Sequence, residues 1–179
     1  MAKIFISFIH EEENLAKLVQ EFIQVELGWE ANAFLSSDPW QVYGGEIWLD
    51  RIKEELKTAE VIILMLSPAS IGRPWVNFEA GAAWLTGKVL IPVCYGGLEK
   101  GNLPHPYSGI QSLSLKGERN YLIASIRHHL KILPDLPPPL DDQRERDANI
   151  PTPPPLGREV QNIMEDIDCE LNKIEKMNS

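Results

Sequence analysis

Residues 61–94 have the sequence VIILMLSPASIGRPWVNFEAGAAWLTGKVLIPVC, which decides the fold. Val61–Leu66 is a continuous apolar run, typical of a strand that is buried on both faces of a parallel sheet. Pro74 stands where a first helical turn begins, and residues 75–86 are predicted to be helical. Val89–Cys94 has the composition of a second buried strand. A strand, a helix and a strand with short connections predict two parallel strands joined by a crossover helix.

The same alternation extends in both directions along the chain. The further expected elements are a strand at 3–8, a helix striped by Leu15, Leu18, Val19 and Phe22, a strand at 31–35, a helix from Glu46, a weaker strand at 110–115 and a closing helix at 121–130. Pro92 indicates that the strand at 89–94 lies toward an edge of the sheet, because proline has no N–H for the ladder. The alternation predicts an α/β fold in which helices cover both faces of a five-stranded parallel sheet.

Ligands of such sheets bind at the carboxyl ends of the strands. In this sequence the predicted rim consists of three segments, residues 7–10, 36–45 and 67–75. The glycine signature of dinucleotide-binding folds is missing after the first strand, and the sequence has no Walker phosphate loop. The central strand ends with Leu66-Ser67-Pro68, where a phospho-acceptor domain would have an aspartate. These patterns exclude three common α/β classes.

Composition narrows the class of protein further. The chain has 179 residues, of which 44% are hydrophobic and 24% charged, as expected for a soluble globular protein. We expect a cytoplasmic protein with no membrane segment, since the sequence shows neither an apolar run of roughly 18 residues nor a secretory leader. The net charge of −9 argues against a nucleic-acid partner. The two cysteines and four histidines lack metal-ligand spacing, so no metal site is expected.

The C-terminal part differs from the rest of the chain. We predict an α/β domain at residues 1–133, a proline-rich linker at 134–157 and an acidic amphipathic helix at 158–179. The apolar stripe of this helix consists of Val160, Ile163, Ile167, Leu171 and Ile174. The helix either folds back onto the domain or pairs with a helix of a regulatory partner, and the sequence leaves both alternatives open.

Five separated motifs resemble those of the Toll/interleukin-1 receptor (TIR) domain family. Phe5–Phe8 resembles the F-[IV]-S-Y box, with Phe8 in place of tyrosine. The family's second box is similar to residues 34–36 together with 44–48. Residues 63–68 resemble the central strand, and Trp75–Glu79 fits W-x-x-x-E. The strand that follows has the family's I-I-P-[IV] character. The resemblance covers about the first 130 residues and implies a flavodoxin-like three-layer fold, with a proline-rich linker and a C-terminal helix added here.

The resemblance also implies an activity. In enzymatic members of the family, the glutamate of W-x-x-x-E is the catalytic residue for cleavage of NAD, which identifies Glu79 as the candidate here. A carboxylate near the ribose stabilises the oxocarbenium-like transition state of that reaction. NAD is then the substrate, and no separate cofactor is implied. The alternative interpretation is structural, since a glutamate near a helix N-terminus often only complements the helix dipole.

The expected substrate-binding residues lie on the predicted rim. They are Phe8, Ile9, His10, Ser36, Asp38, Trp40, Gly44, Gly45, Trp48 and Trp75. Phe8 either stacks on a ring of the substrate or belongs to the core. Ser36 stands where many enzymatic relatives have aspartate, and Asp38 is a substitute for that contact.

Three functions are compatible with the pattern. The first is an NAD glycohydrolase or cyclase that gives nicotinamide and linear or cyclic ADP-ribose, for which the resemblance implies a role in bacterial defence against phage. The second is a non-catalytic adaptor that assembles through TIR–TIR contacts, and such self-association is also expected of the enzyme. The third is an N-glycosidase that uses Glu79 on another nucleotide.

Overall fold

The computed structural model describes residues 2–36, 48–132 and 157–178. Its sheet has five parallel strands in the order β2-β1-β3-β4-β5. The strands are β1 (Ala2–Ser7), β2 (Ala31–Leu35), β3 (Val61–Leu66), β4 (Val89–Cys94) and β5 (Leu113–Ser114). This order is that of flavodoxin-like folds, so the predicted fold class is confirmed.

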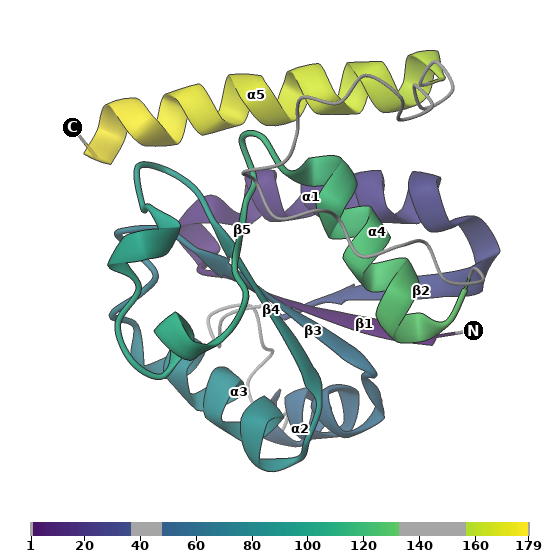
Figure 1. Ribbon diagram of the computed structural model, residues 1–179, viewed down its shortest axis with the longest axis vertical. Helices are drawn as coiled ribbons and strands as arrows, with labels where there is room; N and C mark the ends of the chain where they lie inside the picture. Colours follow the sequence, from purple (N-terminus) through teal and green to yellow (C-terminus); the bar gives the residue numbers. More distant parts are fainter. Residues whose placement is uncertain (1, 37–47, 133–156, 179) are drawn as a thin grey trace, which may run out of the picture.

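Helices cover both faces of the sheet (Figure 1). The α-helices are α1 (Glu13–Leu27), α2 (Trp48–Thr58), α3 (Pro74–Leu85), α4 (Arg119–Leu130) and α5 (Arg158–Asn178). Short 3-10 helices are η1 (His10–Glu12), η2 (Gly28–Glu30), η4 (Lys100–Asn102) and η5 (Tyr107–Gly109). In the described segments, no helix combines the length and apolarity that a membrane crossing requires.

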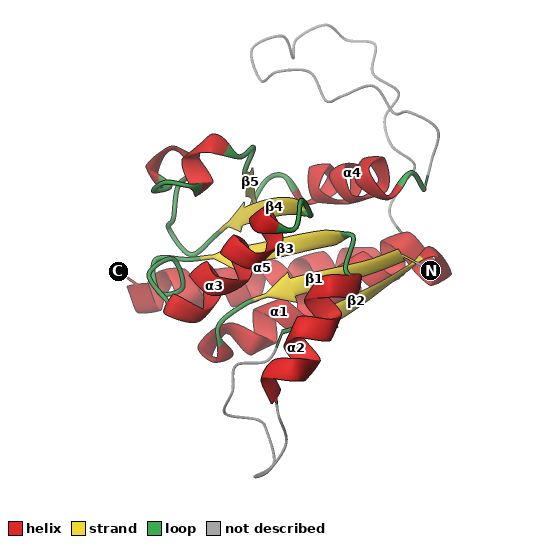
Figure 2. Cartoon of the chain, turned by 90° about the horizontal axis from the view of Figure 1, so that it is seen from below, coloured by secondary structure: helices red, strands yellow, loops and turns green. Residues whose placement is uncertain are grey.

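The sheet separates two hydrophobic clusters. Figure 2 shows the sheet with its helices from below. The first lies between the sheet and α1, α4 and α5, and the second between the sheet and α2 and α3. All six residues of β3 are buried, and they alternate between the two clusters. The continuous apolar run of β3 is therefore explained by burial on both faces.

Of the last two strands, β5 differs from its expected length and β4 has its expected position. β5 has two residues rather than the predicted six, because the N–H of Ile110 donates to the carbonyl of Tyr107 and so closes η5 instead of joining the ladder. β4 is the second strand from the edge, which agrees with the expectation from Pro92 that it lies toward an edge. It pairs with β5 only at Val93 and Cys94, so Pro92 needs no N–H on that side.

The apolar stripe of α5 faces the domain. Val160, Ile163, Ile167, Leu171 and Ile174 are all buried, and they belong to the same cluster as α1 and the sheet. The guanidinium of Arg119, a residue only 7% exposed, donates to the carbonyl of Met164 over 3.2 Å and to the carboxylate of Asp168. In this structure α5 follows the first of the two alternatives and folds back onto the domain. The boundary at residue 133 stays a prediction.

We expect Ile167→Ala to lower the free energy of unfolding of the whole chain by about 2–5 kcal/mol, because the side chain is fully buried and leaves a cavity. Glu165→Ala, at an exposed position of the same helix, serves as the control and is expected to change stability by less than about 0.5 kcal/mol. Urea denaturation measures both. Equal stability of Ile167→Ala and the wild type would show that α5 does not dock on the domain in solution.

Candidate active site

The candidate site is centred on the carboxylate of Glu79, at the carboxyl ends of β1 and β2. Ser36 directly follows β2, and its N–H donates to the carbonyl of Ile6 over 2.8 Å, which fixes it beside β1. The hydroxyl of Ser36 donates to Oε1 of Glu79 over 2.5 Å. The loop after β2 is thereby attached to α3.

Trp75 holds the same oxygen from the other side. Pro74 begins α3, so Trp75 and Glu79 lie one turn apart on the same helical face. The indole Nε1–H of Trp75 donates to Oε1 of Glu79 over 2.8 Å. Glu79 is fully buried, at 0% exposure, and a buried carboxylate is costly unless hydrogen-bond donors stabilise it. These two donors fix the position of the carboxylate relative to the sheet.

An aromatic surface adjoins the carboxylate. The ring of Trp75 stacks on that of Phe78, with centroids 5.2 Å apart and planes inclined by 29°. Trp75 is half-buried and Phe78 is 48% exposed. Ile9 lies in the same cluster as the residues under α3, so it belongs to the Glu79 side of the sheet. Flat apolar surface beside a fixed carboxylate suits a ligand that contains a planar ring.

Two other expected residues lie elsewhere. Phe8 is 3% exposed and packs in the cluster on the α1 side of the sheet, opposite Glu79, which supports its core alternative over ligand stacking. Its neighbour in the chain, His10, is exposed at the start of η1, where Nδ1 lies 3.4 Å from a carboxylate oxygen of Glu13.

The rest of the predicted set falls largely outside the described residues. Asp38, Trp40, Gly44 and Gly45 lie in residues 37–47, which the structure does not describe. Trp48 begins α2, and its side chain is not described either. The contacts proposed for these residues stay predictions.

A comparison with protein-family models matches residues 4–130 to the TIR domain. The chain belongs to the TIR domain family. The match includes every strand from β1 to β5 apart from the first two residues of β1, and it includes both Ser36 and Glu79. No curated protein matches the chain. Catalysis is known for part of this family only, so membership supports either an enzyme or a scaffold.

In this TIR domain a second buried polar cluster was not predicted from the sequence. The phenol of Tyr95, which follows β4, donates to Oε2 of Glu12 in η1, a residue only 5% exposed. Beside them, the hydroxyl of Ser70 accepts from the N–H of Ser67 over 2.7 Å and donates to the carbonyl of Met65 over 3.1 Å. The sequence pattern that indicates this cluster is the position of three polar residues after the carboxyl ends of strands: Glu12, Ser67 and Tyr95.

Burial sets the protonation of these groups. Desolvation raises the pKa of Glu12 above its ordinary value, against the opposing effect of hydrogen bonds from Tyr95 and Ser67. Burial, together with the charge of Glu12, raises the pKa of Tyr95 well above its usual range. Burial also raises the pKa of the Cys94 thiol to about 11, which keeps it protonated and unreactive at neutral pH. No group of three potential metal ligands occurs among the residues described.

The raised pKa of Glu12 predicts a pH-dependent stability. Its contribution to stability is fully present below the ordinary value of 4.5 and is lost as the pH rises through the folded-state pKa. Glutamine cannot ionise and still offers Tyr95 an acceptor. We therefore expect the stability of Glu12→Gln, relative to the wild type, to increase as the pH rises from about 4.5 toward neutrality.

Urea denaturation at a series of pH values measures this difference. Glu21→Gln, at an exposed position of α1, is the control and is expected to show a much smaller pH-dependent change. If the difference in stability between Glu12→Gln and the wild type is the same at every pH, burial does not raise the pKa of Glu12.

Proposed function

We propose that this TIR domain is an NAD nucleosidase that cleaves the bond between ribose and nicotinamide, with Glu79 as the catalytic carboxylate. The observation that carries the proposal is the buried Glu79 carboxylate, held at one oxygen by Ser36 and Trp75 at the carboxyl edge of the sheet. Both its position on the sheet and its place in W-x-x-x-E fit this activity.

The chemistry requires few groups. When the C–N bond breaks, its electron pair leaves with nicotinamide, which departs as a neutral molecule, and positive charge develops on the ribose. A carboxylate next to the ribose stabilises that charge, and no strong general acid is needed. Water, or the adenine ring of the same molecule, then attacks the ribose carbon and releases a proton. Hydrolysis gives ADP-ribose, and the internal attack gives a cyclic product.

Ser36 has a defined role in this proposal. Ser36 donates a hydrogen bond to Glu79 over 2.5 Å, whereas an aspartate at position 36 would place a second negative charge near this carboxylate. The hydrogen bonds from Ser36 and Trp75 orient the Glu79 carboxylate. We place NAD against Glu79 and the ring of Trp75, with Ile9, Asp38, Trp40, Gly44, Gly45 and Trp48 as further proposed contacts. Consumption of NAD would provide the physical basis for the antiphage role that the family resemblance implies.

Glu79→Gln is expected to lower the rate of nicotinamide release by at least ~10²–10³-fold, because the amide keeps the shape but not the charge. The measurement is nicotinamide release from NAD, followed by chromatography with equal amounts of folded protein. Glu60→Gln, an exposed carboxyl at the start of β3, is the matched control and should retain wild-type activity. Wild-type turnover by Glu79→Gln would disprove the assignment. Release of a base from another nucleotide, but not from NAD, would favour the N-glycosidase alternative.

Ser36→Ala tests the positioning of Glu79. It removes one donor to a buried charge, so we expect kcat to fall by about tenfold to a hundredfold, which corresponds to 1.5–3 kcal/mol for a hydrogen bond to a charged group. Ser7→Ala is the matched control, because the hydroxyl of Ser7 is buried at the end of the adjacent strand and has no hydrogen-bond partner among the described residues. Equal kcat values for the two variants would show that Ser36 does not position Glu79.

A specific observation also favours assembly, which the enzyme and the adaptor share. The surface of α3 exposes three large apolar residues, Phe78 at 48%, Trp84 at 70% and Leu85 at 80%. Large apolar residues that gather on one exposed helix often mark a protein interface. We propose that α3 contributes to contacts between copies of this TIR domain.

Trp84→Glu is expected to shift the protein toward the monomer, because it places a charge in the proposed contact. Light scattering measures the average mass of the particles across a hundredfold dilution. A dilution of that size corresponds to roughly 2.7 kcal/mol of mass action. Met177→Glu, which puts the same charge at an exposed apolar residue of α5, is the control. If both variants assemble like the wild type, α3 is not the contact. If Glu79→Gln assembles normally and the wild type leaves NAD intact, the adaptor alternative is correct.

A further inference from the structure

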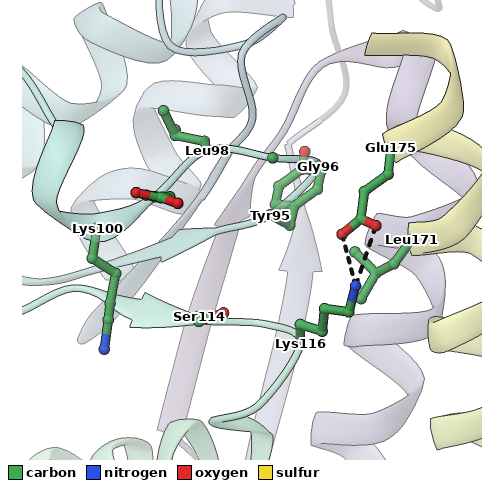
Figure 3. Close-up of a pocket in the computed structure, with 10 residues that line it drawn as sticks. Tyr95, Gly96, Leu98, Lys100, Ser114, Lys116, Leu171 and Glu175 are labelled. Atoms are coloured by element: carbon green, nitrogen blue, oxygen red, sulfur yellow. Dashed lines mark hydrogen bonds and ion pairs between the residues drawn. The ribbon is translucent and has the colours of Figure 1, made fainter. Parts of the chain in front are cut away.

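A cavity lies beside the C-terminal half of α5, at the carboxyl ends of β4 and β5. Its volume is about 390 Å³, which is within the range of small-molecule sites. Three parts of the chain line it: the turn at residues 95–98 with η4, the segment around β5, and the C-terminal half of α5 (Figure 3). The residues that line it include none of Ser36, Trp75 and Glu79. The cavity is therefore separate from the candidate active site.

The turn at the cavity offers backbone donors. Gly96 and Gly97 have φ angles of 62° and 91°, which only glycine adopts without strain, and the N–H of Leu98 closes the turn on the carbonyl of Tyr95 over 3.1 Å. Within the described part of the chain, the N–H groups of Gly96 and Gly97 donate no hydrogen bond. Gly96 and Gly97 line the cavity together with Lys100 and Lys116, and backbone N–H groups combined with lysines suit an anion such as phosphate.

Two lysines stand on opposite sides of this cavity (Figure 3). Lys100 donates to Glu118 over 2.7 Å, and Glu118 in turn accepts from the N–H of Ser114 over 2.5 Å, so the lysine is held in place. Lys116 lies 3.2 Å from both carboxylate oxygens of Glu175 on α5. The ion pair with Glu175 is partly exposed and contributes little to stability, so Lys116 remains available to a stronger anion.

The same cavity contains groups that suit a sugar. The carboxylates of Glu99 and Glu175 are acceptors for hydroxyl groups, as acidic residues are for ribose in nucleotide sites. Leu98 and Leu171 supply apolar surface beside them. We propose that this cavity binds a small molecule that carries a phosphorylated ribose, with the phosphate at Lys116 and the Gly96–Gly97 turn and the hydroxyls at the carboxylates.

The site is complete only while α5 is docked. The close approach of α5 depends on Gly96, because a Cβ at that position would lie 2.9 Å from Cγ2 of Ile174. The side chain of Asn178 donates to the carbonyl of Gly96 over 3.2 Å. A ligand that contacts both Leu171 and the turn stabilises the docked helix, since it binds only that state.

Titration calorimetry of the full chain tests the site with AMP and ribose 5-phosphate, and with adenosine and inorganic phosphate as partial probes. We expect at least one of the first two to bind with a dissociation constant of about 0.1 mM or lower, and each partial probe to bind about tenfold more weakly or worse. Hydrogen exchange with the bound probe should slow at residues 95–98 and 171–175. A comparison of the affinities for AMP and for ribose 5-phosphate shows whether the cavity recognises a base or only the sugar phosphate.

Lys116→Glu is expected to weaken binding by about tenfold or more, because it removes a charged donor and adds a repulsive charge. Lys57→Glu is the matched control, since Lys57 is similarly exposed and also pairs with a glutamate. Lys116→Gln serves as a second variant should the charge reversal unfold the chain. Nicotinamide release by Lys116→Glu is measured alongside ligand binding. Because the two measurements are independent, the failure of this site and the failure of the proposed activity can be told apart.

The proposal is overturned if neither AMP nor ribose 5-phosphate binds. It is also overturned if inorganic phosphate binds as tightly as they do, if the lysine substitutions leave affinity unchanged, or if exchange slows only around residues 75–79.

Discussion

Burial of the Glu79 carboxylate is the constraint on which the arrangement of the site depends. A fully buried charge must be stabilised by donors, and the hydroxyl of Ser36 and the indole of Trp75 provide them at a single oxygen. Ser36 is 43 residues from Glu79 in the sequence, so this contact holds the end of β2 against α3. The parallel sheet makes the contact possible, because all its strands direct their carboxyl ends to one edge.

The strands and helices of the first 130 residues were largely predictable, because their signals are local. β3 is a continuous apolar run, and α3 begins at a proline. β5 was harder to predict, because η5 competes for the backbone of Ile110, and this competition depends on where the chain folds rather than on composition. Pro92 indicated a position toward an edge, and β4 lies there, beside a strand that pairs with it only at Val93 and Cys94.

Among the candidate site residues, the sequence identified Glu79 through motif spacing but not the contacts that hold it. The bond from Ser36 is a tertiary contact between segments whose separation carries no periodic signal. Phe8 shows the limit of pattern alone, since the face on which it lies depends on how β1 ends. The pair of Glu12 and Tyr95 spans 83 residues and was recognisable only as two polar residues that follow strands.

Two hydrogen bonds and short stretches of chain lead from the cavity to α3. Tyr95 lines the cavity beside α5 and donates to Glu12 in η1. The adjacent Glu11 accepts from Arg73 over 2.6 Å, and Arg73 is the N-cap residue of α3, two positions before Trp75. Contiguity of this kind permits coupling between two sites but does not establish it, because coupling also needs an element with two states. In this chain α5 is the natural element to examine, since it reaches the domain after the proline-rich residues 134–157 and completes the cavity only when docked.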